Sequence, residues 1–134
     1  MTAAGTAVSD ILSTQGLLSV TFDAHQKLIR VAGRGFCDKQ TSHEFVANLI
    51  SAISAQRQRG PVRVLVDGRA MVTQSADVVD WMQVETGRLY REGDRVAVLV
   101  SSPLFKLQLQ RSVADNFRRL FVSEEEAQAW LAAA

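Results

Sequence analysis

The feature that most constrains the fold is a repeated change between strand-like and helix-like spacing of apolar residues. Residues 62–67 alternate valines with Arg63, Leu65 and Asp67, and residues 95–100 repeat this pattern. Alternation at every second residue is typical of β-strands. Residues 17–23, 27–35 and 120–122 are expected to form three further strands. The short connection between the first two of these predicts an antiparallel hairpin.

Four other segments predict helices, because each starts at residues that commonly cap helices and continues with apolar residues at helical spacing. They cover residues 41–60, 75–91, 102–119 and 123–131. The resulting order is β-β-α-β-α-β-α-β-α. Strands that alternate with helices in this way predict an α/β fold with a mixed, mostly parallel five-stranded sheet.

The two faces of this sheet differ in character. One face carries the β-branched residues Ile29, Val31, Val64, Val66, Val96 and Val98, and the other carries Arg30, Arg34, Arg63 and Arg95 beside Leu65 and Leu99. Right-handed crossovers between neighbouring strands place their helices on a single face. We therefore expect all four helices on the valine face and a largely open arginine face. That open face could pack on a second copy of the chain, which makes a homodimer a further expectation.

The length of 134 residues suits one domain. Residues 1–14 are small and polar, so we expect a disordered arm there and a single domain over residues 15–134. The 15 basic and 14 acidic residues leave a net charge of +1, which argues against a nucleic acid or an anionic membrane as partner. Of the 15 basic residues, 12 are arginines. Because arginine forms planar, bidentate and stacked contacts, the positions of these arginines say more about function than the net charge does.

Several classes of protein are not expected from this sequence. A lone cysteine, Cys37, allows no intrachain disulfide and no cysteine-based metal site. The longest apolar run has five residues, far fewer than the ~20 that span a bilayer. The first ten residues lack the basic and apolar regions of a secretory signal, so a cytoplasmic location is expected.

Two stretches carry a likeness to a known family. The third strand ends in Val64-Leu65-Val66-Asp67, and the chain closes with Phe121-Val122-Ser123-Glu124-Glu125-Glu126-Ala127-Gln128-Ala129-Trp130-Leu131. With the order of elements, these resemble the STAS superfamily, and within it the SpoIIAA-like branch of small stand-alone bacterial proteins. The likeness covers residues 16–131. It implies the fold above, together with protein–protein signalling or the binding of an apolar ligand.

The resemblance also singles out Ser75. In members that act as anti-sigma-factor antagonists, a partner kinase phosphorylates a serine at the start of the helix after the third strand, in the pattern Asp-Ser-Ser-Gly-Leu. The matching stretch here is Thr73-Gln74-Ser75-Ala76-Asp77, which keeps that serine and changes the Asp, the first Ser and the Gly. Ser75 is thus a phosphoacceptor-like position by resemblance. As a residue, it is also explained as a plain helix N-cap.

Two surfaces are further candidates. Ligands of open α/β sheets bind outside the carboxyl ends of the strands. There, Arg34, Asp67, Arg69 and Ser102 could hold an anion, or could belong to ordinary strand-to-helix loops. A partner surface could involve Arg30, Arg63 and Arg95 on the open face, and Leu104 and Leu107, which fall off the apolar stripe of the third helix.

Catalytic chemistry has weaker support. Glu85 interrupts the apolar stripe of the second helix, either as a pKa-shifted site residue or in a salt bridge to Arg88 or a strand arginine. Cys37 lies six residues before His43, but no third group orients the pair. His25 and His43 lack further ligands at metal-binding spacing. We expect a non-enzymatic STAS-type binding or regulatory module without a cofactor. The alternative is a carrier of a small apolar or acyl anionic ligand at the sheet rim.

Overall fold

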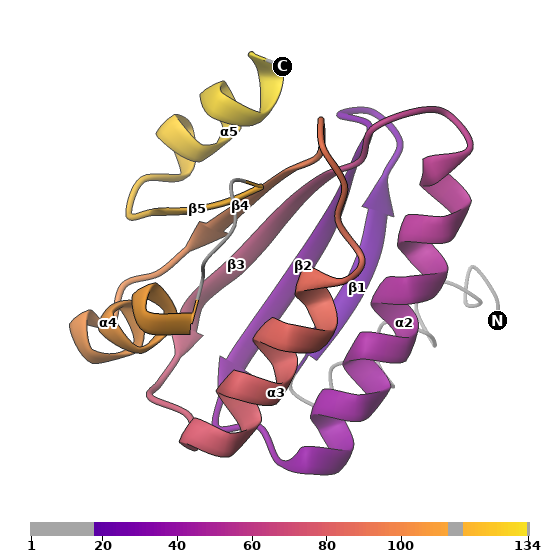
Figure 1. The fold of residues 1–134 in the computed structure, drawn as a ribbon. Helices are drawn as coiled ribbons and strands as arrows, with labels where there is room; N and C mark the ends of the chain where they lie inside the picture. The colour runs from indigo at the N-terminus through magenta and orange to yellow at the C-terminus, as the bar shows by residue number, and fades with distance from the viewer. Residues whose placement is uncertain (1–17, 113–116, 134) are drawn as a thin grey trace, which may run out of the picture.

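The chain forms a five-stranded sheet whose strands lie in sequence order, β1-β2-β3-β4-β5, as predicted (Figure 1). The computed structural model describes residues 18–112 and 117–133. The strands are β1 (Leu18–Asp23), β2 (Leu28–Gly35), β3 (Arg63–Met71), β4 (Arg95–Leu99) and β5 (Arg118–Phe121). The helices are α2 (Lys39–Arg57), α3 (Ala76–Gly87), α4 (Pro103–Ser112) and α5 (Glu124–Ala132). Strands β1 and β2 are antiparallel, and every other neighbouring pair is parallel. The predicted fold class and element order are therefore confirmed.

The β1–β2 hairpin closes through the side chain of Asp23. One of its carboxylate oxygens accepts the backbone N–H groups of His25 and Gln26, each at 3.0 Å. Lys27 completes the turn with a φ of 58°. Aspartate favours such turns because its short side chain bonds to backbone N–H groups a few residues ahead.

The helix starts at Ser75 and Ser123 are confirmed, whereas several other boundaries differ from the prediction. Asp38 caps α2 by accepting the backbone N–H of Thr41 at 2.7 Å, so the helix begins before the predicted Thr41. Helix α4 is shorter than predicted and β5 begins at residue 118 instead of 120. The rest of the predicted 102–119 helix crosses residues 113–116, outside the described residues, as does the predicted arm over residues 1–14.

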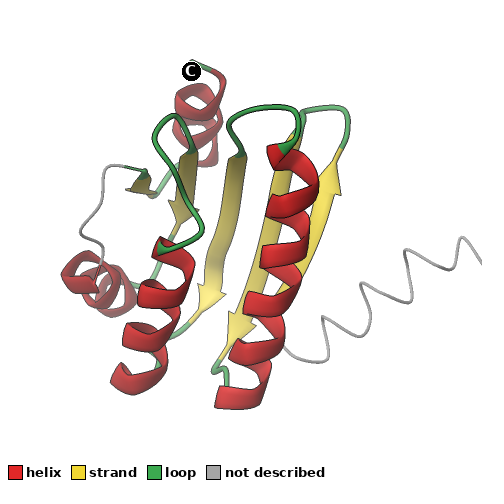
Figure 2. Cartoon of the chain, turned by 45° about the vertical axis from the view of Figure 1, so that its right-hand side comes forward, coloured by secondary structure: helices red, strands yellow, loops and turns green. Residues whose placement is uncertain are grey.

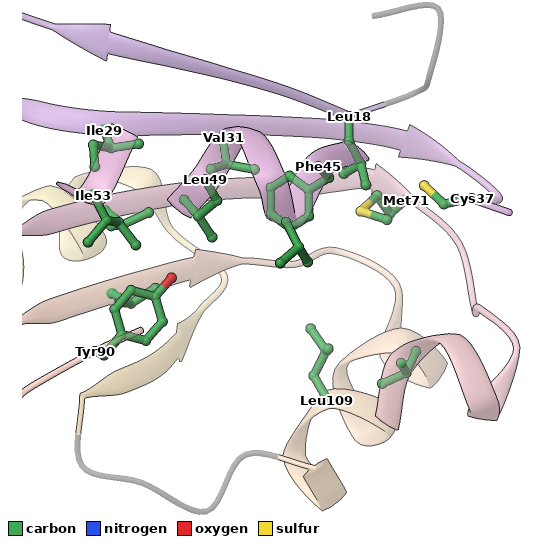
Figure 3. Close-up of a cluster of buried hydrophobic side chains, with 14 of the residues drawn as sticks. Leu18, Ile29, Val31, Cys37, Phe45, Leu49, Ile53, Met71, Tyr90 and Leu109 are labelled. Atoms are coloured by element: carbon green, nitrogen blue, oxygen red, sulfur yellow. The ribbon is translucent and has the colours of Figure 1, made fainter. Parts of the chain in front are cut away.

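Helices α2, α3 and α4 cover the valine face of the sheet (Figure 2). Each belongs to a right-handed crossover between neighbouring parallel strands, so all three lie on the same side. The resulting core joins strand residues such as Ile29 and Val31 to Phe45, Leu49 and Leu109 of the helices (Figure 3). The prediction for this face is confirmed.

The prediction that all four helices share one face is wrong for α5. Its residues Ala127 and Leu131 pack on the opposite face, against Leu65, Ala97 and Leu99, and form a second buried cluster. Helix α5 follows the last strand and connects no strand pair, so the crossover rule does not set its side. The leucines of the arginine face supplied the apolar surface that the helix covers. The face is consequently closed over β3–β5 and not open there.

A buried ion pair fastens the amino-terminal edge of the parallel strands. The carboxylate of Asp94, whose side chain is fully buried, pairs with Arg57 at 2.6 Å. It also accepts the backbone N–H groups of Val62 and Arg91 at 2.9 and 2.7 Å. A second guanidinium nitrogen of Arg57 donates to the carbonyl of Leu89 at 2.7 Å. Asp94 thus joins α2, the start of β3 and the loop before β4.

Candidate functional site

The carboxyl edge of the sheet is organised by one buried amide, Gln74. Its side chain accepts the backbone N–H of Cys37 at 2.8 Å and donates to the carbonyl of Gly35 at 2.8 Å and to that of Val72. Its backbone is held in turn by Gln108 of α4, through hydrogen bonds of 3.0 and 2.7 Å. Gln74 therefore connects the end of β2, the loop after β3 and helix α4.

Large apolar side chains are exposed around this clamp. Phe36 lies between the two residues of the β2 end that Gln74 holds, and Val72 is itself a Gln74 partner. Leu104 and Leu107 lie within one helical turn of Gln108. Their exposed fractions are 55% for Phe36, 51% for Val72, 67% for Leu104 and 52% for Leu107. We call these four residues the carboxyl-edge patch.

The patch is unusual because its members are large and close to one framework. Eight large hydrophobic residues are exposed in the described part of the chain. Four of them lie in segments that the Gln74 and Gln108 hydrogen bonds connect, and a fifth, Val122, follows β5 at the same edge of the sheet. Single exposed hydrophobic residues are common, whereas a group of them marks an interaction surface. Leu104 and Leu107 were predicted as part of a partner surface from the sequence, but Phe36 and Val72 were not. The signal that could have identified Phe36 and Val72 is an apolar residue directly after each of two strands.

Ser75 begins α3 beside this patch. Its hydroxyl oxygen accepts the backbone N–H of Val78 at 3.2 Å, and the side chain is partly exposed. The serine thus performs the N-cap role that its residue type suggests. The neighbouring Gln74, which replaces the first serine of the family pattern, is the clamp described above.

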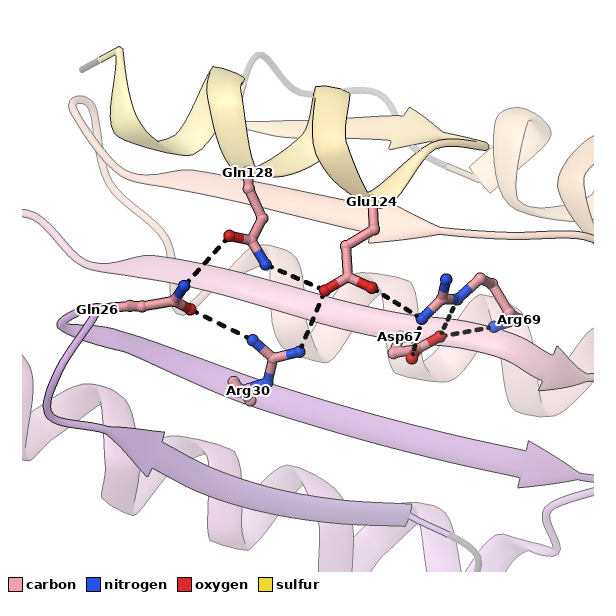
Figure 4. Close-up of polar contacts among 6 residues, drawn as sticks. All are labelled: Gln26, Arg30, Asp67, Arg69, Glu124 and Gln128. Atoms are coloured by element: carbon pink, nitrogen blue, oxygen red, sulfur yellow. Dashed lines mark hydrogen bonds and ion pairs between the residues drawn. The ribbon is translucent and has the colours of Figure 1, made fainter.

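The four residues predicted as an anion site are only partly brought together. Arg34, Asp67 and Arg69 line one shallow hollow on the arginine face, whereas Ser102 lies outside it. The Ser102 hydroxyl instead accepts the backbone N–H of Phe105 at 3.2 Å, as a helix cap does. Two carboxylates already hold the Arg69 guanidinium, Asp67 at 2.8 Å and Glu124 at 3.1 Å (Figure 4).

This ion pairing shifts both groups in the expected directions. The hydrogen bonds from Arg69 hold the pKa of Asp67 below its ordinary value, and the same contact raises the pKa of Arg69. Glu124 extends the network to Arg30 at 3.6 Å, and Gln128 joins it to Gln26 at 3.2 Å (Figure 4). The network therefore ties α5 to β2 and β3.

The predicted arginine surface is divided by α5. Arg30 belongs to the Glu124 network. Arg95 lies over the ring of Trp130 of α5, with its guanidinium carbon 5.0 Å from the ring centroid. Arg63 is the register neighbour of Arg95 and is half-buried. Only Leu104 and Leu107 of the predicted partner surface belong to the carboxyl-edge patch.

A cavity of about 90 Å³ lies between the valine face and helices α2, α3 and α4. Its lining is mostly apolar and includes Val66, Val98 and Phe105. Arg118 of β5 brings a charged group to this lining, where it donates to the side chains of Gln83 and Thr86 at 2.8 and 3.2 Å. No sequence pattern predicts this cavity, because its existence depends on how three helices pack.

The three catalytic candidates, Cys37, His43 and Glu85, each contact different residues. Cys37 is fully buried, and burial, followed by the charge of Asp38, raises the pKa of its thiol to about 11. The His43 ring lies against Trp81 instead, with centroids 4.0 Å apart. Glu85 forms an ion pair with Arg88 at 3.0 Å, the salt bridge that its position suggested.

The part of the chain that the structure describes contains neither a cluster of metal-ligating residues nor a helix that could span a membrane. No group of three or more His, Cys, Asp or Glu residues there could hold a metal ion. Among the helices of residues 18–112 and 117–133, none has the length and apolarity needed to cross a bilayer.

Neither a family model nor a curated protein sequence matches the chain, so the comparison with known proteins rests on solved structures. The unphosphorylated anti-sigma factor antagonist SpoIIAA superposes with a TM-score of 0.65 and 16% identity, over 87% of this chain and 97% of that one. An anti-sigma factor antagonist from Mycobacterium paratuberculosis gives 0.62 and 16%, over 86% and 94%. An uncharacterised DUF3478-family protein from Shewanella loihica, described as having a SpoIIAA-like fold, gives 0.60 and 16%, over 85% and 91%. The chain therefore has the SpoIIAA-like fold, in agreement with the resemblance in its sequence.

Proposed function

We propose that this protein is a non-enzymatic regulatory module that binds a protein partner through the carboxyl-edge patch. The single observation that carries the proposal is the grouping of Phe36, Val72, Leu104 and Leu107 around the Gln74–Gln108 clamp. Two proteins of the same fold are anti-sigma factor antagonists, which supports a regulatory role of this kind.

The clamp suits the patch for binding because it fixes the backbone beneath it. Gln74 is 5% exposed, and its side chain bonds to backbone on both sides of Phe36. A surface that is held in place before binding loses less conformational freedom when a partner arrives. Exposed apolar side chains on such a framework can then contribute their full burial to the complex.

The experiment compares three immobilised proteins in affinity capture from the cells that make this chain. The wild type is set beside Leu104→Asp, in the patch, and Val84→Asp, on the exposed side of α3. Aspartate near the start of α4 agrees with the helix dipole, so Leu104→Asp is expected to fold. We expect a partner that the wild type and Val84→Asp retain and Leu104→Asp loses. A set of captured proteins that does not distinguish the two variants would contradict the proposal.

The cavity favours a second candidate function, the carrier of a small apolar or acyl anionic ligand, which would lie between the sheet and the helices and not at the sheet rim, where the sequence placed it. Its apolar lining suits a hydrocarbon group, and Arg118 could meet the anionic end of such a ligand. Native mass spectrometry of freshly purified protein tests this candidate. A mass increment that disappears on denaturation, and that is identified as an acyl anion, supports it. Protein that carries no ligand and takes up no added short-chain acyl anion contradicts it.

A further inference from the structure

Two arginines meet the same indole ring on the face that α5 covers. Arg95 begins β4, Arg119 lies on β5, and Trp130 lies near the end of α5. The guanidinium carbons are 5.0 and 5.2 Å from the centroid of the Trp130 ring. Arg95 also donates a hydrogen bond to the backbone carbonyl of Trp130. These contacts hold both cations at one ring.

The positive charge gathered here has no carboxylate ion pair in the parts of the chain that the structure describes. Each ion pair found there involves other arginines. Arg63, the register neighbour of Arg95 on β3, adds a third cation on the same face. Like charges on directly paired strand residues destabilise a sheet. The nearby Asp94 does not offset them, because Arg57 and two backbone N–H groups occupy its carboxylate.

Arg95 and Arg119 both line an open hollow. It has a volume of about 680 Å³. Its lining also includes Gly93, Phe117, Trp130 and two acidic residues, the exposed Glu92 and Asp94, whose side chain is fully buried and paired with Arg57. The hollow lies where β4 and β5 begin, at the opposite end of these strands from the carboxyl-edge patch. A small molecule could enter it without disturbing either the Gln74 clamp or the internal cavity.

We propose that this hollow binds the terminal phosphate group of a small organic phosphate, through Arg95 and Arg119. A guanidinium group forms two parallel hydrogen bonds to a planar or tetrahedral oxyanion. A carboxylate has two oxygens and can pair in this way with one guanidinium group. A terminal phosphate has three oxygens and a charge between −1 and −2 at neutral pH. The phosphate can thus serve both guanidinium groups, and the open hollow leaves room for the organic part.

The test is titration calorimetry of the full chain with inorganic phosphate, pyrophosphate and acetate at constant ionic strength. The variant Arg119→Gln removes an exposed side chain, so it is the first choice, and Arg111→Gln on exposed α4 is the matched control. Because a charge-assisted hydrogen bond is worth a factor of about ten or more, Arg119→Gln should weaken binding by at least about tenfold. Thermal unfolding checks that each variant is folded.

Fluorescence provides a second measurement at the site itself. In a Trp81→Phe background, Trp130 is the remaining tryptophan, and phosphate bound to its two arginines should change its emission in a saturable way. Saturable binding of phosphate or pyrophosphate by the wild type and Arg111→Gln, with loss in Arg119→Gln, supports the proposal. Absence of saturable binding, equal binding by Arg119→Gln, or equal affinity for acetate overturns it.

Discussion

The side chain of Gln108 binds both backbone polar groups of Gln74: its amide oxygen accepts the Gln74 N–H at 3.0 Å, and its amide nitrogen donates to the Gln74 carbonyl at 2.7 Å. The two residues are 34 positions apart in the chain. Their contact makes α4 and the loop before α3 one surface. The carboxyl-edge patch depends on this contact for its shape.

Replacing Gln74 with alanine should destabilise the protein. The change leaves the buried N–H of Cys37 and the carbonyl of Gly35 without their side-chain partner. An unsatisfied buried polar group costs about 1–3 kcal/mol, so a loss of this size or slightly more is expected in urea unfolding. Gln110→Ala, at an exposed position of α4, should unfold like the wild type. Equal stability of both variants would show that the clamp does not stabilise this edge.

Removing the charge of Asp94 should be among the most damaging single changes. Asp94→Asn leaves Arg57 next to an uncharged partner in a site where the Asp94 side chain is fully buried. Breaking one side of a buried ion pair costs about 3–5 kcal/mol. Chemical denaturation should show this loss, while Glu92→Gln, two residues away and exposed, should change stability little. A loss below that of Glu92→Gln would contradict the role given to the pair.

Helix α5 should contribute a separate part of the core. Leu131→Ala removes a side chain that is 1% exposed in the second cluster, and Leu107→Ala removes one that is 52% exposed. A buried leucine-to-alanine change costs about 2–5 kcal/mol. The free energy of unfolding should therefore fall for Leu131→Ala and stay nearly constant for Leu107→Ala. Similar values for the two would mean that α5 does not cover the arginine face in solution.

The Asp67–Arg69 pair predicts a pH effect in acid. Hydrogen bonds from Arg69 lower the pKa of Asp67 in the folded state from its ordinary value of 3.8. The stabilisation is therefore present above pH 3.8 and is lost as the pH falls through the lower folded value. Thermal melts of the wild type and Asp67→Asn should differ at neutral pH and converge below about pH 4. A difference that stays constant into acid would exclude this linkage.

The thiol of Cys37 should be unreactive in the folded protein. Its side chain is fully buried, and burial raises its pKa to about 11, so little thiolate forms at neutral pH. A thiol-specific reagent should label it only as fast as the protein unfolds, and completely in denaturant. Rapid labelling under native conditions, with the melting curve unchanged, would contradict this burial.

The order of the sheet could be predicted because local patterns and the handedness of crossovers decide it together. The alternation of apolar residues around Val64 and Val96 is enough to predict which face of the sheet these two valines occupy. The side taken by α5 could not be predicted in this way, because no later strand constrains a terminal helix. The leucines at 65 and 99 were the available clue, since a sheet face with buried leucines needs a cover.

The candidate site was predictable only in part for a similar reason. Leu104 and Leu107 can be identified in the sequence because they lie off the apolar stripe of their helix. Gln74, in contrast, is seen in the sequence only as a residue that differs from the Asp-Ser-Ser-Gly-Leu pattern of the family. Its importance comes from partners that are 34 to 39 positions away in sequence, at Gln108, Cys37 and Gly35. The pairing of Arg95 with Arg119 at Trp130 likewise depends on the position of α5.

Hydrogen–deuterium exchange of the chain, with and without its captured partner, tests the central claim most directly. The account predicts that the partner protects backbone amides around Phe36, Val72 and Leu104–Leu107, and leaves those around Ile50 and Val84 unchanged. Protection confined to the outer sides of α2 and α3, or to α5, would contradict the carboxyl-edge patch as the binding surface.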